Sequence, residues 1–230
     1  SKGLENNSLK TMSEVILEVS GVGQKRIASL YGPSHAEEVL KGFPTTLVAA
    51  SIDKKTSVLV QDIFSSDVLR VYSNNDLKGV ELGGSLKNII AIATGICDGI
   101  GFGDNTKAAL LTRGLAEITR LGILMGAKES TFSGLSGIGD LIATCLSDHS
   151  RNRHVGEEIG KGKSLSTILE NMDMVAECVK TTQSVHDLSK KYNLDMPISE
   201  GVYKILFENK NPKSIVSELM NRDLVNESSN

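Results

Sequence analysis

The sequence predicts an α/β segment over residues 1–76 and an all-helical domain over residues 77–230. Three observations predict this arrangement. Short β-type runs alternate with helix-length runs before residue 76, which is typical of a parallel sheet. From residue 77 onward the β-type runs disappear. Apolar residues there recur at helical spacing instead, as Ala108, Leu111 and Ile118 do.

Each element of the α/β segment has a local justification. Helical spacing of apolar residues predicts a first helix, which ends where Gly21 and Gly23 follow. Ser34 comes just after a strand end at Gly32 and is expected to cap the next helix. The expected strands cover residues 27–31, 45–50 and 69–73, and the expected helices cover 9–20, 34–39 and 54–64. The leading strands of such a sheet are not found, so we expect an uncovered edge that is marginal in stability or pairs with another chain.

The second part of the chain contains helical patterns throughout. The expected helices cover residues 77–97, 105–125, 151–159, 164–172, 176–192, 197–207 and 212–220. One stripe of the first of these helices carries Gly83, Gly84, Lys87, Ala91 and Thr94. Lys87 is therefore the one long, positively charged side chain among small residues on that stripe. The glycine pair permits either close packing of another helix or the approach of a small ligand beside an ammonium.

Composition narrows the classes of function. The chain has 230 residues, of which 40% are hydrophobic, and a net charge of −3. A net negative charge does not suggest a nucleic-acid-binding protein. The sequence contains no long uncharged apolar run of the kind that predicts a membrane span. We therefore expect a soluble, cytoplasmic protein. Cys97, Cys145 and Cys178 lack the spacing of a zinc site or a redox pair, and the histidines lack metal-ligand spacing, so no metal is assigned.

Two further stretches carry residues suited to chemistry. Asp140 follows a glycine-dense turn over residues 134–139, where a carboxylate is most often a helix N-cap. Ser150 and Arg151 open a helix, where free N–H groups, a hydroxyl and a guanidinium match what a phosphate dianion requires. The positive end of the helix dipole disfavours an arginine at a helix start. A bound anion would interact favourably with both the guanidinium and the dipole, which would explain the arginine at this position. Surface decoration is the alternative.

Residues 79–114, together with the stretches over 134–145 and 150–153, closely resemble the NAD(P)-dependent glycerol-3-phosphate dehydrogenases. The resemblance extends from Lys2 to about Leu219. It implies the C-terminal part of a Rossmann-like NAD(P)-binding domain, followed by a helical substrate domain of the 6-phosphogluconate dehydrogenase C-terminal type.

The resemblance also implies roles for individual residues. Lys87 corresponds to the catalytic acid/base, a role that lysine fills when desolvation or nearby cations lower its pKa. Asn88 is expected to orient a hydroxyl or Lys87, with a helix-surface amide as the alternative. The implied substrate-binding residues are Lys2, Gly32, Ser34, Lys87, Asp140, Ser150, Arg151 and Asn152, and the implied cofactor-binding residues are Lys2, Ala36, Arg151, Val175 and Glu177.

The activity implied by the resemblance is the interconversion of dihydroxyacetone phosphate and sn-glycerol 3-phosphate with NAD or NADP, for glycerophospholipid synthesis. The Gly-x-Gly-x-x-Gly fingerprint of dinucleotide binding is not found, so we expect a fragment that is inactive alone. A reductase of another small hydroxy acid and a non-catalytic helical module are the alternatives. The choice between NAD and NADP and a possible homodimer stay open.

Overall fold

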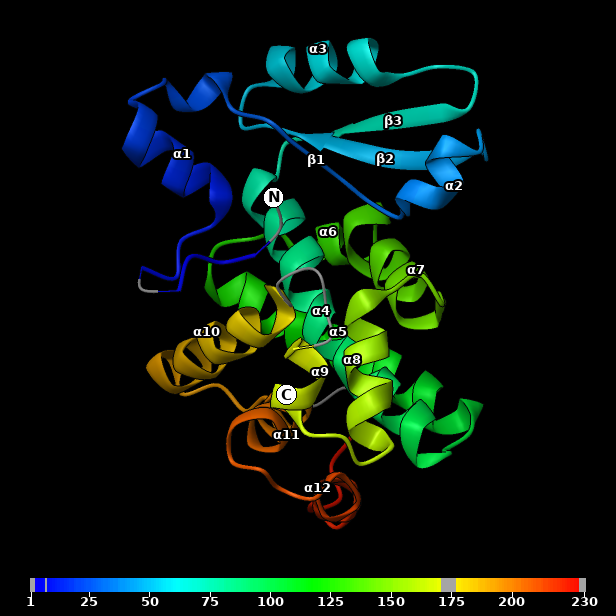
Figure 1. Ribbon diagram of the computed structural model, residues 1–230. Coiled ribbons are helices and arrows are strands. Elements are labelled where there is room, and N and C mark those ends of the chain that lie inside the picture. The colour runs from blue at the N-terminus through cyan, green and yellow to red at the C-terminus, as the bar shows by residue number, and fades with distance from the viewer. Residues whose placement is uncertain (1–2, 7, 171–176, 228–230) are drawn as a thin grey trace.

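The computed structural model describes residues 3–6, 8–170 and 177–227. It has a small three-stranded sheet with a helical domain beside it, and helix α4 runs from the sheet into the helical domain (Figure 1). The strands are β1 (Ser29–Tyr31), β2 (Thr45–Ala50) and β3 (Leu69–Asn74). The α-helices are α1 (Met12–Ser20), α2 (Ala36–Leu40), α3 (Lys54–Phe64), α4 (Leu77–Ile100), α5 (Asp104–Leu124), α6 (Glu129–Phe132), α7 (Asp140–Leu146), α8 (Arg151–Gly160), α9 (Leu165–Glu170), α10 (Glu177–Tyr192), α11 (Pro197–Phe207) and α12 (Pro212–Met220).

The sheet has the order β1-β2-β3 and is mixed. Strands β2 and β3 are parallel, with Thr45 opposite Leu69, as predicted. Strand β1 runs antiparallel to β2, with Ser29 opposite Ala50, so the expectation of a parallel strand there is wrong. Helix α2 has five residues and is about 7 Å long, which is too short to carry the chain back along a strand of about 20 Å. An antiparallel edge strand on a parallel sheet is common.

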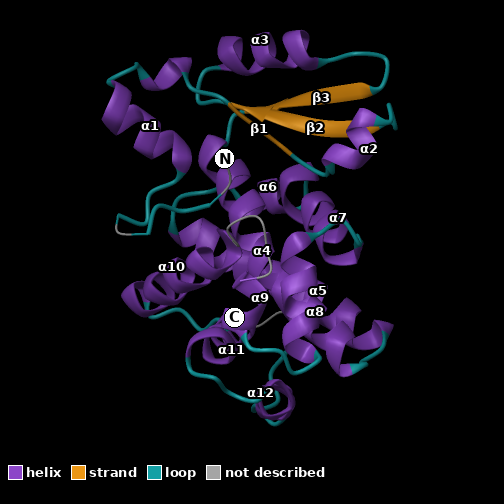
Figure 2. Cartoon of the chain, viewed as in Figure 1, coloured by secondary structure: helices purple, strands orange, loops and turns teal. Residues whose placement is uncertain are grey.

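The two faces of the sheet pack against different helices (Figure 2). Leu47 and Ala49 of β2 point to the α3 side, where they form a cluster with Val71. Val48 and Ala50 point to the opposite side. This second cluster also contains Ile27 and Tyr31, together with Leu77 and Val80 from the first turn of α4. The start of α4 is thus part of the sheet's core.

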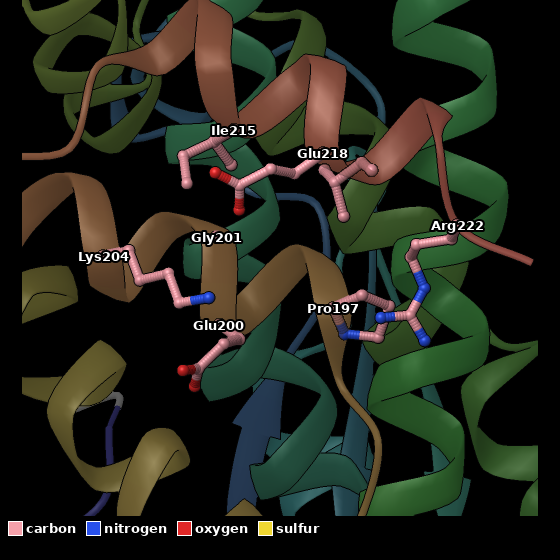
Figure 3. Close-up of a pocket in the computed structure, with 8 residues that line it drawn as sticks. Pro197, Glu200, Gly201, Lys204, Ile215, Glu218 and Arg222 are labelled. Carbon is pink, nitrogen blue, oxygen red and sulfur yellow. The ribbon is translucent and has the colours of Figure 1, made fainter.

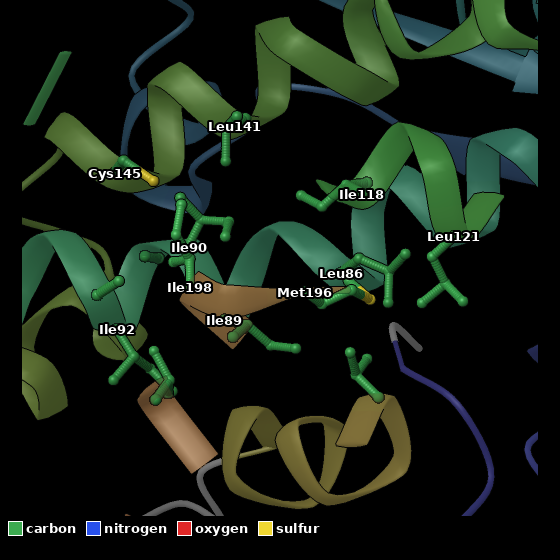
Figure 4. Packing of buried hydrophobic residues seen from close by; sticks show 14 of the residues in the cluster. Leu86, Ile89, Ile90, Ile92, Ile118, Leu121, Leu141, Cys145, Met196 and Ile198 are labelled. Atoms are coloured by element: carbon green, nitrogen blue, oxygen red, sulfur yellow. The ribbon is translucent and has the colours of Figure 1, made fainter. Parts of the chain in front are cut away.

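The rest of α4 forms the centre of the helical domain (Figure 4). Nearly every residue over 77–97 is buried, including Leu86, Ile89 and Ile90. By length and composition α4 is apolar enough to cross a membrane, but its apolar window is entirely buried by protein. Its hydrophobic surface therefore packs against the neighbouring helices, among them α5, α7 and α8.

Helices α4 and α8 cross in close contact. A Cβ added to Gly95 of α4 would lie 1.9 Å from the carbonyl oxygen of Arg153, and one added to Gly156 of α8 would lie 2.1 Å from that of Ile92. Each helix therefore offers bare backbone to the other. This contact fixes where α8 begins relative to α4.

Buried carboxylates fix other element ends. Asp76 caps α4 through Gly79 N at 3.0 Å and also accepts hydrogen bonds from Lys128 N at 2.8 Å and Thr131 Oγ1 at 2.6 Å. Glu117 of α5 caps α11 by accepting from Ile198 N at 2.7 Å and from Ser199 N at 3.1 Å. Burial raises the pKa of the Glu117 carboxyl, although these hydrogen bonds act in the opposite direction.

Some predicted ends differ from the structure. Helix α2 begins at Ala36 with His35 as its N-cap residue, and the Ser34 hydroxyl donates to Gly32 O at 3.2 Å instead of capping the helix. Helices α6 and α7 were not among the predicted helices, since the glycines around them hide the helical spacing. Residues 171, 172 and 176, at the ends of two predicted helices, lie outside the described residues.

Candidate active site

Three buried side chains meet where α4 and α7 pack together. Lys87 of α4 forms an ion pair with the carboxylate of Asp140, the first residue of α7. The same Nζ donates a hydrogen bond of 2.6 Å to Thr144 Oγ1, one turn further along α7. The side chains of Lys87 and Asp140 are 5% and 3% exposed, so solvent does not screen the pair. This cluster is the strongest concentration of buried charge near the predicted site residues.

The electrostatics of the cluster are those of a compensated buried pair. Burial alone disfavours both charges, and each becomes tolerable because the other lies beside it. Asp140 also benefits from its place at a helix N-terminus, where the dipole favours negative charge. The Asp140 carboxylate is the charge beside the Lys87 ammonium in this pair, and the lowered pKa expected of Lys87 stays a prediction. The N-cap of α7 is Gly139, so Asp140 is not the N-cap residue itself.

Thr144 is a site residue that sequence reasoning missed. It lies four residues after Asp140 and therefore on the same face of α7. Its hydroxyl accepts from Lys87, so it still has a proton to donate. The i, i+4 relation to an acidic residue was the available signal, but a threonine in an apolar run reads as a packing residue without the fold.

The glycine-dense turn before Asp140 is a single π-helical turn over Leu135–Gly139. A Cβ on Gly137 would lie 2.0 Å from Phe132 O, so only glycine allows this tight path. A Cβ on Gly83 of α4 would lie 2.6 Å from Ser136 O, which shows how closely the turn approaches α4. Turns of this type occur often at functional sites. Here the turn places Asp140 against Lys87.

The glycine pair before Lys87 is filled by protein. The backbone at Ser136 occupies the space beside Gly83, and the ring of Tyr31 lies where a Cβ on Gly84 would be, 2.1 Å from that position. The packing interpretation of these glycines is therefore correct. The alternative, in which the notch holds a small ligand, is wrong, because β1 and the π-helical turn already approach α4 there.

The loop between β1 and α2 carries three of the predicted binding residues. Gly32 is buried and has a φ of +138°, and a Cβ there would meet Thr46 O at 3.1 Å. The positive φ explains why residue 32 is a glycine, whether or not a ligand also approaches it. Ser34 and Ala36 are exposed, on either side of His35. Both are therefore accessible to a ligand.

The start of α8 is organised by a serine cap and an arginine. Ser150 is buried, and its Oγ accepts from Arg153 N at 3.3 Å. Arg153 donates from Nε to Asp98 at 2.8 Å and from a terminal nitrogen to Asp148 at 2.9 Å. Burial acts to lower the pKa of Arg153, but the hydrogen bond to Asp98 and the charges of Asp98, Glu157 and Asp148 together raise it. Carboxylates of the protein, not a ligand, are thus the anions beside this arginine.

The other two polar residues of this helix start face outward. Arg151 is exposed and Asn152 is half-buried. Asn88, which follows Lys87, is buried, so the interpretation as a surface amide is wrong. These positions leave Arg151 accessible at the N-terminal end of α8.

Comparison with known proteins identifies the family. Residues 1–57 match the family model described as "NAD-dependent glycerol-3-phosphate dehydrogenase N-terminus", and residues 76–217 match the corresponding C-terminal model. The chain belongs to this family. The match confirms the resemblance read from the sequence, and residues 58–75 lie between the two matched stretches.

The family's individual members agree with this assignment. The chain is 58% identical to glycerol-3-phosphate dehydrogenase [NAD(P)+] 2 of Salinibacter ruber, over 96% of this chain and 64% of the relative. It is 56% identical to the enzyme of the same name from Pelodictyon phaeoclathratiforme, over 98% of this chain and 68% of the relative. The chain thus spans about two thirds of the length of these relatives.

Solved structures of the family confirm the predicted fold class. The crystal structure of glycerol-3-phosphate dehydrogenase from Coxiella burnetii matches with a TM-score of 0.90 and 40% identity, over 96% of this chain and 67% of that chain. The enzyme from Plasmodium falciparum matches with a TM-score of 0.88 and 25% identity, over 98% of this chain and 65% of that chain. A part of a Rossmann-like sheet followed by a helical domain is therefore the correct architecture.

The remaining predicted residues lie apart from this description. Lys2 and Val175 fall outside the described residues, and Glu177 is the first residue of α10, with its side chain not described. No group of three metal-ligating side chains occurs over residues 3–6, 8–170 and 177–227.

Figure 3 shows a surface pocket between α11 and α12, lined by Pro197, Glu200, Gly201, Lys204, Ile215, Glu218, Leu219 and Arg222. None of these eight was predicted as a site residue.

The two described cysteines near the helix crossing are unreactive. Cys97 and Cys145 are both free and buried. Burial raises the pKa of Cys97 to about 11 and that of Cys145 to about 12. Both stay protonated near neutral pH and have little nucleophilic character.

Proposed function

We propose that this chain carries the substrate-binding and proton-transfer residues of an NAD(P)-dependent enzyme that interconverts dihydroxyacetone phosphate and sn-glycerol 3-phosphate. The observation that carries the proposal is the buried contact of Lys87 with Asp140 and Thr144, in a member of this family. Burying an ammonium and a carboxylate costs desolvation free energy that their attraction does not reliably repay, so such a pair is better explained by a function than by stability. Reduction of a ketone gives it a function.

The chemistry assigned to Lys87 is proton donation to the ketone oxygen. NAD(P)H, when bound, supplies the hydride that adds to the carbonyl carbon. The Lys87 ammonium gives its proton to the oxygen that becomes the alcohol, and the neutral amine takes a proton back in the oxidation direction. Asp140 keeps Lys87 protonated at the start of the reduction, and Thr144 fixes the direction of Nζ.

The phosphate of the substrate is assigned to the start of α8. Ser150 N-caps this helix, and Arg151 stands exposed at its first position. Free backbone N–H groups and a guanidinium suit a dianion. Asn152 is placed to add an amide donor, and Gly32 and Ser34 approach the substrate from the β1–α2 loop. Arg153 is occupied by Asp98 and Asp148 and has a supporting role.

The cofactor is NAD or NADP. Ala36 and Arg151 are exposed and lie on the loop and helix start assigned above, so they fit a role beside the cofactor. Lys2, Val175 and Glu177 complete the proposed contacts. We place the enzyme in the cytoplasm, in glycerophospholipid synthesis, as a possible homodimer.

The test uses the complete product of the gene that encodes these 230 residues. Lys87→Met is expected to reduce kcat for dihydroxyacetone phosphate reduction by about 10²- to 10⁴-fold, the usual contribution of a general acid. Because this change leaves Asp140 buried without its cation, Lys87→Arg serves as a second variant. The guanidinium keeps the charge but does not release a proton near neutral pH, so activity is again lost while the protein folds.

Substrate binding is tested separately from turnover. Glycerol 3-phosphate is expected to raise the melting temperature of the unsubstituted protein, and glycerate, which lacks the phosphate, is not. Normal turnover by Lys87→Arg would refute the role of Lys87. An equal shift with both ligands would refute the phosphate site and favour a reductase of another small hydroxy acid.

A further inference from the structure

His35 connects the loop after β1 to the helix that carries Asp140. It is the N-cap residue of α2, but its side chain makes no hydrogen bond to that helix. Instead Nε2 lies 3.3 Å from the carbonyl oxygen of Ala143 in α7. The ring is half-buried between these two elements, which are 108 residues apart in the sequence. A residue in a favourable capping position therefore uses its side chain for a tertiary contact.

The chemistry of the contact assigns the proton. A backbone carbonyl oxygen only accepts hydrogen bonds, so His35 Nε2 must be the donor. Ala143 O has a second lone pair and also accepts from Ser147 N at 3.2 Å, at the end of α7. Both the neutral Nε2–H tautomer and the imidazolium carry a proton on Nε2.

The two ends of this hydrogen bond hold different parts of the proposed site. On one side, Ser34 and Ala36 flank His35 in the sequence. On the other, Ala143 lies between Asp140 and Thr144, the two residues that contact Lys87. Any movement of the loop relative to α7 changes the distance between the loop's binding residues and the Lys87 ammonium.

We propose that His35 is a positioning residue, which holds the β1–α2 loop in register with α7 and so sets the substrate carbonyl and the cofactor at the correct distance from Lys87. This rests on the function proposed above. Reaction rates are sensitive to such placement, since an error of about 1 Å costs up to 10²-fold. The contact is partly exposed, so its loss is expected to affect geometry more than stability.

A neighbouring histidine provides the matched control. The ring of His149 lies 6.1 Å from that of His35, centroid to centroid, with the planes tilted by 49°. His149 is exposed, and only its backbone N–H has a described hydrogen bond, to Ser147 Oγ. Replacing His149 thus removes a ring near His35 and leaves the bond to Ala143 in place.

The experiment compares His35→Leu, His35→Gln and His149→Leu in the complete gene product. The amide nitrogen of glutamine reaches a position similar to that of Nε2 and donates a hydrogen bond, whereas leucine does not. We expect His35→Leu to lower kcat per folded active site about tenfold, with His35→Gln within about threefold of the unsubstituted protein. His149→Leu is expected to match the unsubstituted protein.

The results of this experiment distinguish a positioning role of His35 from a purely structural one. A lower melting temperature for His35→Leu with unchanged kcat per folded site would mean a purely structural role and overturn the proposal. Equal losses in His35→Gln, or in His149→Leu, would overturn the assignment to the Ala143 hydrogen bond. If the unsubstituted protein has no activity with dihydroxyacetone phosphate, the proposed function fails, and this result is separate from any effect of His35.

Discussion

The ion pair of Lys87 and Asp140 depends on both of its members, because protein encloses the two charges. Each side chain is at most 5% exposed, and Thr144 is the described hydrogen-bond partner of Nζ. Removing one member of such a pair leaves an uncompensated charge in a medium of low polarity. The proposed function and the stability of the protein therefore both depend on the contact between Lys87 Nζ and Asp140 Oδ1.

The substitution Asp140→Asn is expected to lower the free energy of unfolding by about 3 kcal/mol, since the buried Lys87 ammonium then loses the carboxylate of its ion pair. It also removes the carboxylate that keeps Lys87 protonated, so reduction of the ketone slows strongly. Urea unfolding of the purified protein measures the first effect, and steady-state turnover measures the second.

The double variant Lys87→Met/Asp140→Asn is the control for this prediction. With both charges absent, no buried ion is left uncompensated, so the double variant should be more stable than the sum of the single losses predicts. Free energies that add to within about 0.5 kcal/mol would show that the two residues are not coupled. That result would contradict the buried-pair interpretation.

At the residue scale, the sequence pattern indicated individual residues but not all of the side chains that they contact. Lys87 and Asp140 were both identified, and the structure brings them together. Thr144 and the burial of Asn88 were not, because both depend on how α7 and α4 pack. The ring of Tyr31 beside Gly84 was equally unpredictable, since it comes from a strand 53 residues earlier.

At the scale of elements, the crossing of α4 and α8 determines where the proposed phosphate site lies. Gly95 and Gly156 let the two backbones touch, and α8 begins at Arg151, directly after its cap Ser150. If the helices separate, the α8 N-terminus moves away from Lys87. The glycines of the crossing thus act on substrate binding without contacting substrate.

We predict that Gly95→Ala lowers the free energy of unfolding by about 2 kcal/mol, because its Cβ would lie 1.9 Å from Arg153 O and force the helices apart. The melting-temperature increase produced by glycerol 3-phosphate should shrink as well. Gly23→Ala is the control, since nothing lies within 4 Å of its added Cβ and its φ of −61° suits alanine. That change should leave stability equal or slightly higher. Equal losses in both variants would contradict this account.

Element boundaries were predicted well where local chemistry sets them. Helix α3 and strand β2 match the predicted ranges, and so do α11 and α12, which begin at Pro197 and Pro212. Prolines at the first turn mark a helix start in the sequence itself. The direction of β1 and the π-helical turn over Leu135–Gly139 depend on tertiary contacts, so no local pattern could give them.

At the scale of the whole molecule, α4 joins the two parts of the chain into one structure. Its first turn packs against the sheet through Leu77 and Val80, and its later turns form the core of the helical domain. The sequence pattern predicted a helix over residues 77–97, but not that this one helix would belong to two cores. The division at residue 76 stays a prediction, since the two parts share this helix.

Asp76 stands where the sheet meets α4, and its carboxylate makes three hydrogen bonds. One caps α4 through Gly79 N, and the others hold Lys128 N and Thr131 Oγ1 at the loop that leads toward Asp140. Asp53 is a helix cap with fewer contacts. It caps α3 by accepting hydrogen bonds from Thr56, at 3.0 Å from N and 3.1 Å from Oγ1. The two caps differ in whether they connect separate parts of the chain.

Asp76→Ala is expected to lower the free energy of unfolding by about 3 kcal/mol, against about 1 kcal/mol for Asp53→Ala. The larger loss arises because Lys128 N and the Thr131 hydroxyl are left without their acceptor beside the first turn of α4. Movement of residues 126–131 also displaces the turn before Asp140, so the affinity for glycerol 3-phosphate should fall in Asp76→Ala and stay unchanged in Asp53→Ala. Urea unfolding and ligand-induced thermal shifts measure the two effects, and equal losses in both variants would show that Asp76 acts as a helix cap alone.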